Sequence, residues 1–147
     1  MYTYSFKQVS GGFAHPLVPP FLFAGQIGLN ELQVVMSTDK SQLQVAADGT
    51  ILGSVIAGDN GELVLTMQQT SALHTYLTIW YNVIHALLLA GIVNNWFSAA
   101  MTIRTPNTTH ICTGVAPPKI PDQPYAAQGQ NVVWRLVAAD VQTIRVP

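Results

Sequence analysis

Two glycine-containing turn signals, Asp48-Gly49 and Asp59-Asn60-Gly61, divide residues 31–68 into short apolar-rich runs. Such pairs favour the positive φ values that tight hairpin turns need. In the last run, Glu62–Gln68, apolar residues occupy every second position on one face, which is the period of a half-buried strand. The pattern predicts an antiparallel meander of three short strands that leads into a helix, with Gly61 at a positive φ in the second turn.

A helix is predicted after this meander because the period changes to steps of three and four. It covers Ser71–Leu89, with Thr70 or Ser71 as the N-cap and Gly91 as the C-terminal stop. The apolar residues of its stripe are Leu73, Leu77, Trp80, Tyr81, Ile84 and Leu88. A narrow polar stripe of Thr75, Thr78, Asn82 and His85 lies opposite, so the helix is amphipathic.

Charge is scarce along the whole chain. Charged residues make up 9% of it and hydrophobic residues 49%, whereas soluble domains carry roughly 25% charged residues. No charged residue lies between Glu62 and Arg104, so the outer side of the helix is expected to be covered by a membrane, by the rest of the domain or by another subunit. A membrane is disfavoured, because the cleanest apolar run, Val83–Val93, contains a histidine and is shorter than the ~20 residues that spanning requires.

The remaining segments predict further strands. Alternating aromatic residues predict an opening strand over residues 2–6, ended by Gly11-Gly12. Residues 99–105 and 109–113 predict two strands, residues 114–129 a proline-rich loop and residues 131–139 a closing strand. With about seven short strands and one helix in 147 residues, we expect a single, mainly β (α+β) domain. It is predicted to be an antiparallel β-sandwich or partly closed barrel with one flanking α-helix.

The segment Phe13–Phe23 is apolar and contains three prolines, so it is not expected to form a central strand. One interpretation is a loop that packs on its own domain. The other is an arm that packs on a neighbouring subunit, because such apolar segments are rarely left exposed. The subunit-interface candidates are the apolar residues Leu17, Val18, Phe21 and Phe23.

No catalytic, metal-binding or cofactor-binding constellation is apparent, so we do not expect an enzyme. His110 and Cys112 lie two apart on a predicted strand and share a face, but a metal site would need further ligands. We therefore interpret Cys112 as a buried structural thiol. The segment Gly25–Gly28 has two glycines but lacks the lysine and the preceding strand of a phosphate-binding loop.

The few charges are divided between two regions. Residues 31–62 hold five acidic residues and one lysine, and residues 104–145 hold four basic and two acidic residues. Salt bridges within the chain would explain this division, and so would head-to-tail complementarity between copies. The net charge of −1 argues against a dedicated nucleic-acid binder, in which a basic stripe is expected.

Several segments together resemble a family of small tail tube proteins from contractile-tailed bacteriophages. They are Tyr4–Val9, Ser37–Lys40 with the Asp48-Gly49 turn, Gly58–Met67 leading into Thr70-Ser71, and Gly129–Ala139 with its Val-Trp-Arg strand. The resemblance covers nearly the whole chain and rests on turns and strands. The chain departs from the family pattern in its longer, proline-richer arm and in the apolar character of residues 82–95.

The resemblance implies a structural protein of the virion tail, with no cofactor. Six copies would form a ring, and stacked rings would form the tube through which the genome passes without specific binding of DNA. The implied partners are further copies of the chain and the tail sheath, tape-measure and baseplate proteins, with assembly in the cytoplasm of the host bacterium.

A channel that lets DNA slide should be neutral to acidic, because each basic residue on its wall would repeat in every ring and hold the duplex. The candidates for the lumen or for contacts between rings are the acidic residues Asp39, Asp48, Asp59 and Glu62. The alternative function is a monomeric β-sandwich binding module, for example a carbohydrate-binding one. In that case Trp80, Trp96 and Trp134 would form a sugar-stacking surface.

Overall fold

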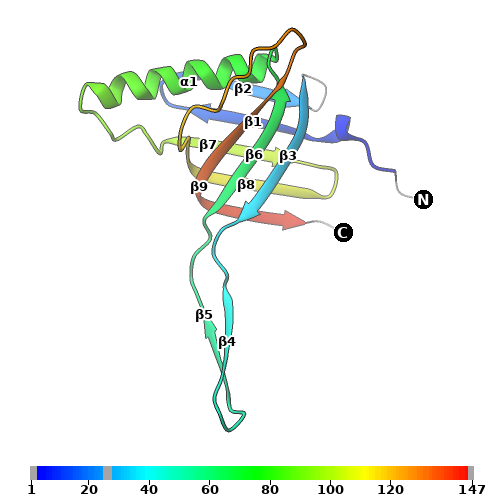
Figure 1. Ribbon diagram of the computed structural model, residues 1–147, viewed down its shortest axis with the longest axis vertical. Coiled ribbons are helices and arrows are strands. Elements are labelled where there is room, and N and C mark those ends of the chain that lie inside the picture. Colours follow the sequence, from blue (N-terminus) through cyan, green and yellow to red (C-terminus); the bar gives the residue numbers. More distant parts are fainter. Residues whose placement is uncertain (1–2, 25–27, 146–147) are drawn as a thin grey trace.

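The computed structural model describes residues 3–24 and 28–145, which form nine β-strands, one α-helix and a short 3-10 helix, Phe6–Gln8. The strands of the body are β1 (Ser10–His15), β2 (Val18–Ala24), β3 (Leu29–Met36), β6 (Gly61–Gln68), β7 (Ala99–Arg104), β8 (Thr108–Ala116) and β9 (Asn131–Arg145). The helix α1 spans Ala72–Leu89, and β4 (Ser41–Val45) and β5 (Ile51–Val55) form a separate hairpin. The predicted class, mainly β with one flanking helix, is confirmed (Figure 1).

Seven strands form one antiparallel sheet in the order β2-β1-β7-β8-β9-β6-β3. The long strand β9 joins its two halves, because residues 131–138 pair with β6 and residues 137–145 pair with β8. The sheet therefore curls into a half-barrel, and β1, β7 and β8 run across the direction of β3 and β6 (Figure 1). Strands β2 and β3 are its two free edges.

The helix closes the concave side of this sheet. Its N-cap is Ser71, whose hydroxyl oxygen accepts a hydrogen bond from the backbone N–H of His74 at 3.2 Å. Its C-terminus is a Schellman motif, because Gly91 has φ +82° and the N–H of Ile92 donates to the carbonyl oxygen of Leu87 at 2.9 Å. The predicted helix, its Ser71 cap and its glycine stop are thus confirmed.

The core lies between the helix and the concave face of the sheet. The helix contributes Leu73, Leu77, Trp80 and Ile84, all fully buried. The sheet contributes alternate residues of its strands, including Phe13, Leu63, Leu65, Met67, Met101, Ile103, Cys112, Val132, Trp134 and Leu136. Alternation along each strand places these side chains inside and leaves the convex face to solvent.

The predicted opening strand is wrong. Tyr2 lies outside the described residues, residues 3–5 are irregular, and Ser5 caps the 3-10 helix that follows. The first strand is β1, which includes Gly11 and Gly12. A side chain at Gly11 would be 2.5 Å from the carbonyl oxygen of Thr102 and would overlap the ring of Phe23. The glycines therefore allow close packing within the sheet, where the sequence pattern predicted a break.

The predicted meander is also wrong in its second turn. Strand β3 pairs with β6, not with β4, and the hairpin β4–β5 continues the same two-stranded ribbon beyond the sheet. The Asp48-Gly49 turn is confirmed, with Gly49 at φ +89°. The chain does not turn at Gly61, where the sequence predicts a positive φ; its φ is not positive.

Gly61 is needed for a different reason. A Cβ atom there would be 2.7 Å from the backbone oxygen of Val35 and 3.0 Å from Cγ2 of Val141. The neighbouring strands β3 and β9 thus approach position 61 too closely for any side chain there. Hydrogen bonds to Asn60 hold the segment before Gly61 in place. Its backbone oxygen accepts a hydrogen bond from the N–H of Ser37 at 3.0 Å, and its side-chain oxygen accepts one from the hydroxyl of Thr38.

The later strand predictions are confirmed with shifted boundaries. Strands β7 and β8 match the pair predicted around Pro106, and β9 starts as predicted but extends to Arg145. Residues 114–116 belong to β8, so the proline-rich segment begins after them. Gly114 has φ +64°, which marks an irregularity in the pairing of β8 with its neighbours.

Candidate functional site

Across the described ranges, 3–24 and 28–145, no group of three or more metal-ligating side chains comes together. His110 donates to or accepts from the hydroxyl of Thr143 at 2.9 Å and does not contact a thiolate. Cys112 is fully buried, and burial together with the nearby Asp140 raises the pKa of its thiol to about 11. The thiol stays protonated at neutral pH, which makes it a poor nucleophile and a poor metal ligand.

The three tryptophans do not form a surface for sugars. Trp80 and Trp134 are fully buried, and the indole N–H of Trp134 donates to Nδ1 of His74 at 3.0 Å. Trp96 is half-buried and packs edge-on against Tyr81. Two of the three rings are core residues, which removes the structural basis of the carbohydrate-binding alternative.

The apolar arm forms the hairpin β1–β2 and packs mainly on its own chain. Val18 and Phe23 are buried in the core, and Phe21 is half-buried and stacks on Tyr76 with ring centroids 4.9 Å apart. Leu17 remains 49% exposed. The prolines Pro19 and Pro20 are accommodated because β2 is an edge strand. Of the predicted interface residues, Leu17 is the most exposed, and Leu22, which was not predicted, is 83% exposed.

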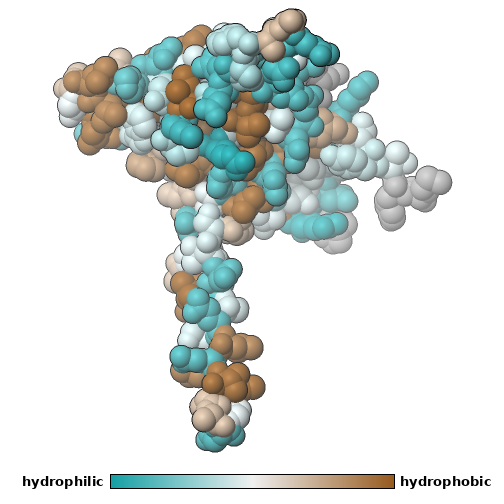
Figure 2. Space-filling view, in the orientation of Figure 1, coloured by the Kyte–Doolittle hydropathy of each residue, from teal (hydrophilic) through white to brown (hydrophobic). Residues whose placement is uncertain are grey.

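The hairpin β4–β5 is the most prominent surface feature, and all ten residues of its strands are exposed. It extends far from the body (Figure 1), and apolar and polar side chains alternate along it (Figure 2). In its register, one face carries Leu43, Val45, Ile51 and Val55, and the opposite face carries Gln42, Gln44, Ser54 and Leu52. An isolated two-stranded hairpin is marginally stable in water, so its apolar face is suited to contact with another protein surface.

Three of the four candidate carboxylates lie along this ribbon outside the sheet. Asp59 forms an ion pair with Lys40 at the base of the hairpin. Asp48 lies at the tip, where hydrogen bonds from Thr50, the backbone N–H first, lower the pKa of its carboxyl. Asp39 lies in the segment between β3 and β4, next to Lys40 in the sequence. All three side chains are exposed.

Glu62 differs from these three because it lies on the convex face of the sheet. Its Oε1 is 3.4 Å from Nη1 of Arg135 on the adjacent strand β9. The same face carries uncharged side chains such as Val64, Thr66 and Val133, and the exposed carboxylate of Glu31, which lies opposite Thr66 in the register of β3 and β6. The Glu62–Arg135 pair cancels its own charge, so the surface made by β3, β6 and β9 is neutral to acidic.

A second exposed surface is the outer side of α1 and the segment that follows it. Its exposed positions at steps of three and four are Ala72, Thr75, Ile79, Asn82, Ala86 and Leu89. Leu88, predicted in the apolar stripe, is also exposed because it lies in the last turn, beyond the part of the helix that packs on the sheet. Ile92, Val93 and Phe97 extend the surface beyond the helix and are also exposed. No charged side chain lies on this side of the helix, as expected if another subunit covers it.

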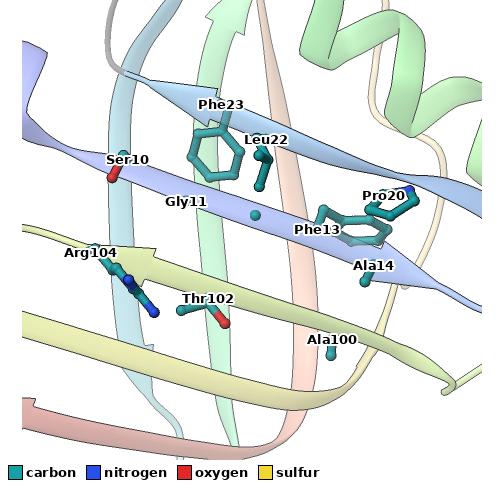
Figure 3. Close-up of a pocket in the computed structure, with 11 residues that line it drawn as sticks. Ser10, Gly11, Phe13, Ala14, Pro20, Leu22, Phe23, Ala100, Thr102 and Arg104 are labelled. Carbon is teal, nitrogen blue, oxygen red and sulfur yellow. The ribbon is translucent and has the colours of Figure 1, made fainter.

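A groove of about 510 Å³ lies on the convex face of β2, β1 and β7. Figure 3 shows Leu22 and Pro20 from β2 on one side, and Ala100, Thr102 and Arg104 from β7 on the other. The floor between them is low because β1 contributes Gly12 and Ala14 there. The sequence pattern did not indicate this groove, because its residues come together only through pairing between β1 and two separate strands.

The matching family model is described as "Bacteriophage PhiTE tail tube protein", and it matches residues 1–145 of the chain. The chain belongs to this phage tail tube family. It is therefore a structural protein of the phage tail and not an enzyme, and the resemblance noted from the sequence is confirmed. No curated protein matches the sequence.

Solved structures support the fold. A chain in the baseplate of the anti-feeding prophage (AFP) is similar with a TM-score of 0.62 and 19% identity, over 99% of both chains. A chain in the extended sheath-tube complex of PVC, an extracellular contractile injection system, has a TM-score of 0.61 and 15% identity, over 99% of this chain and 93% of that one. A chain in the PVC sheath/tube terminator has a TM-score of 0.60 and 12% identity, over 98% of both. At these identities, the likeness shows the fold alone.

Within the described part of the chain, no helix is both long enough and apolar enough to cross a bilayer.

Proposed function

We propose that this protein forms sixfold rings that stack into the tube of a contractile phage tail and conduct the genome during delivery. The observation that carries the proposal is the fully exposed, amphipathic hairpin β4–β5 on a chain of the tail tube family. A monomer would leave its apolar face in water, whereas contact with a neighbouring ring would bury it. Sheath and baseplate proteins are the proposed outer partners, and a tape-measure protein is the proposed template for polymerisation.

Two kinds of contact are needed for a stack of rings. Each strand of the hairpin is five residues long, or roughly 17 Å at 3.3–3.4 Å per residue, and β4 begins beyond the segment that follows the end of β3 at Met36. That reach suits an axial contact with the next ring. The free edges β2 and β3 and the uncharged outer side of α1 are suited to lateral contacts within one ring. Both contacts are heterologous, as cyclic rings and open stacks require.

The convex face of β3, β6 and β9 is the proposed channel wall. Glu62 and Arg135 neutralise each other there, and the exposed Glu31 adds a negative charge beside uncharged neighbours such as Val64 and Thr66. Duplex DNA carries about one negative charge per 1.7 Å of its axis, so a neutral to acidic wall avoids a repeated electrostatic hold in every ring. In this arrangement Asp39, Asp48 and Asp59 lie at contacts between rings and Glu62 faces the channel.

The test is electron microscopy of the purified chain at increasing concentration. Wild-type protein should form tubes, and a helical reconstruction should place the Glu62–Arg135 pair on the inner wall. The variant Leu43→Gln/Val55→Thr makes the apolar face of the hairpin polar and should remain unstacked with an unchanged far-UV circular dichroism spectrum. The matched control, Gln42→Ser/Gln44→Ser on the opposite face, should assemble normally.

Two results would contradict the proposal. A wild-type chain that stays monomeric at every concentration and salt condition would refute ring assembly. A tube whose inner wall is dominated by Arg104 or Lys119 would refute the assignment of the channel face while leaving the tube itself in place.

A further inference from the structure

We propose that Asn60 is a site of spontaneous deamidation, and that hydrogen bonds at the base of the β4–β5 hairpin control how fast it reacts. Asn60 is exposed and is the only asparagine in the sequence that is followed by glycine. Asparagine deamidates fastest before glycine, because no side chain on the next residue hinders the attack of its backbone nitrogen. The proposal concerns a single chain and does not depend on the assembly of rings.

The reaction needs only water. The backbone nitrogen of Gly61 attacks Cγ of Asn60 and closes a succinimide ring. The bond from Cγ to Nδ2 breaks, and Nδ2 leaves as ammonia with the proton that the Gly61 nitrogen gives up. Water then opens the ring. Opening at Cγ gives aspartate, and opening at the main-chain carbonyl carbon of residue 60 gives isoaspartate, in which the main chain passes through the former side chain.

The packing of the fold requires the glycine that makes this reaction fast. A Cβ atom at position 61 would be 2.7 Å from the backbone oxygen of Val35 and 3.0 Å from Cγ2 of Val141. A larger residue after Asn60 would slow the reaction, but it would not fit between β3 and β9. The rate is therefore controlled by the contacts that hold Asn60 and not by the residue that follows it.

Two hydrogen bonds keep the reacting groups apart. The N–H of Ser37 donates to the backbone oxygen of Asn60 at 3.0 Å, so this carbonyl points toward the segment that follows β3. The peptide bond between Asn60 and Gly61 is trans, so the N–H of Gly61 points the opposite way. The hydroxyl of Thr38 donates to Oδ1 of Asn60 and holds the side-chain amide on the side of the carbonyl. The nitrogen can attack Cγ only after this arrangement opens.

Neighbouring contacts keep the base of the hairpin closed. Thr38 packs closely on Gly58, where a Cβ atom would be 3.2 Å from its Cγ2. Lys40 forms an ion pair with Asp59, and its backbone oxygen accepts from the N–H of Ile56 at 2.8 Å. A two-stranded ribbon opens more readily than the interior of a sheet. Loss of one ordinary hydrogen bond from the closed form should therefore raise the open population, and the rate of deamidation, by about two- to tenfold.

Isoaspartate changes the length of the main chain at this point. It adds one carbon atom between residues 60 and 61, so the hydrogen bond from Ser37 and the pairing of Gly61 with Met36 no longer fit the same register. Either product also adds a negative charge next to Asp59. We expect the isoaspartate form to have a loosened hairpin base.

Mass spectrometry of the digested full-length protein tests the site. All proteins carry the Leu43→Gln/Val55→Thr substitutions, so that assembly does not affect the rate, and are incubated at pH 8. Asn60 should deamidate at least about tenfold more slowly than in a free peptide of residues 57–64, because the folded chain must open first. It should still react faster than Asn107, which is exposed between β7 and β8 and is followed by threonine. A rate at Asn60 equal to that of the peptide would overturn the protection by the fold.

A matched pair of variants tests the control by Thr38. Thr38→Val keeps the shape of the side chain without the hydroxyl and should raise the rate at Asn60 by about two- to tenfold. Thr38→Ser keeps the hydroxyl and should react at the rate of the unsubstituted chain. Equal rates in the two variants would overturn the control by this hydrogen bond. Asn60 that reacts no faster than Asn107 even in Thr38→Val would overturn the assignment of the site.

Hydrogen exchange tests the structural consequence. Asn60→Asp carries the added charge with a main chain of normal length, so the Ser37 amide should exchange as slowly as in the unmodified protein. In the purified isoaspartate form the same amide should exchange faster. Equal exchange in these two forms would overturn the change of register.

Discussion

The hydrogen bond between Trp134 and His74 should make the stability of this fold depend on pH. The indole N–H of Trp134 donates to Nδ1 of His74 at 3.0 Å, the tryptophan is fully buried, and the histidine is 8% exposed. The variant His74→Leu keeps a similar volume but leaves the buried N–H without an acceptor. An unsatisfied buried donor costs about 1–3 kcal/mol. Because leucine regains some of this through burial, we expect a loss of about 1–2 kcal/mol at pH 8.

Lowering the pH should reduce the difference in unfolding free energy between the wild-type protein and His74→Leu. Burial lowers the pKa of His74 below its ordinary value of 6.5, so the unfolded chain binds a proton at that site more readily than the folded chain does. The stabilisation is therefore complete above about pH 6.5 and is lost progressively as the pH falls below that value. Protonation also places a hydrogen on Nδ1, which then can no longer accept from Trp134.

The assay is a double-mutant cycle of His74→Leu and Trp134→Phe, measured by urea unfolding at pH 8 and pH 5. The cycle is made in the Leu43→Gln/Val55→Thr background, so that unfolding is measured on unassembled protein. We expect a coupling free energy of about 1 kcal/mol at pH 8 and a smaller value at pH 5. A coupling that is zero at pH 8, or that does not change with pH, would refute the reasoning. Other groups titrate equally in all four proteins and cancel.

Three further predictions concern single sites. Gly61→Ala should destabilise the fold by about 1–3 kcal/mol in thermal unfolding, because its Cβ would be 2.7 Å from a backbone oxygen, whereas Gly53→Ala, with its nearest contact at 3.6 Å, should change it by less than about 1 kcal/mol. Cys112→Ser should leave assembly intact and cost about 1–2 kcal/mol, the penalty of a buried hydroxyl. Native protein should also resist thiol alkylation at pH 8, since Cys112 is buried with a pKa of about 11; rapid labelling of folded tubes would contradict this.

The sequence predicts the helix well because its signals are local. The serine at the N-cap, the apolar stripe at steps of three and four, and the glycine beyond the last turn all lie within about one helix length. The predicted β7–β8 pair and the Asp48-Gly49 turn depend on equally short segments. Each of these features is determined by residues within a few positions of one another.

The errors arise where the structure depends on residues far apart in the chain. Whether Asp59-Asn60-Gly61 turns or stays extended is decided by Ser37 and Thr38, which bond to Asn60 across the ribbon. Gly11 and Gly12 suggested a break, but their role depends on Thr102, about ninety positions later in the chain. Local turn propensity cannot distinguish a hairpin turn from a glycine that permits close packing.

The candidate site shows the same division. The sequence indicates an uncharged surface that another subunit would cover, and the structure places exposed apolar residues on the hairpin and on the outer side of α1. The sequence does not indicate which apolar residues are exposed. Val18 and Phe23 are core residues, and Leu22, which lies between the half-buried Phe21 and the buried Phe23 on an edge strand, points outward because of the period of two.

A contact between the hairpin of one copy and a different surface of a copy in the next ring has a consequence for tail length. The two surfaces lie on different parts of the chain, so the contact is heterologous and does not close on itself along the tube axis. Each added ring covers one set of hairpins and presents one new set, so every addition is energetically equivalent to the one before. Nothing in such a contact counts rings. The length of the tube must therefore be set by a separate component, which is the role proposed here for a tape-measure protein, and the last set of unpaired surfaces must be covered by a different chain.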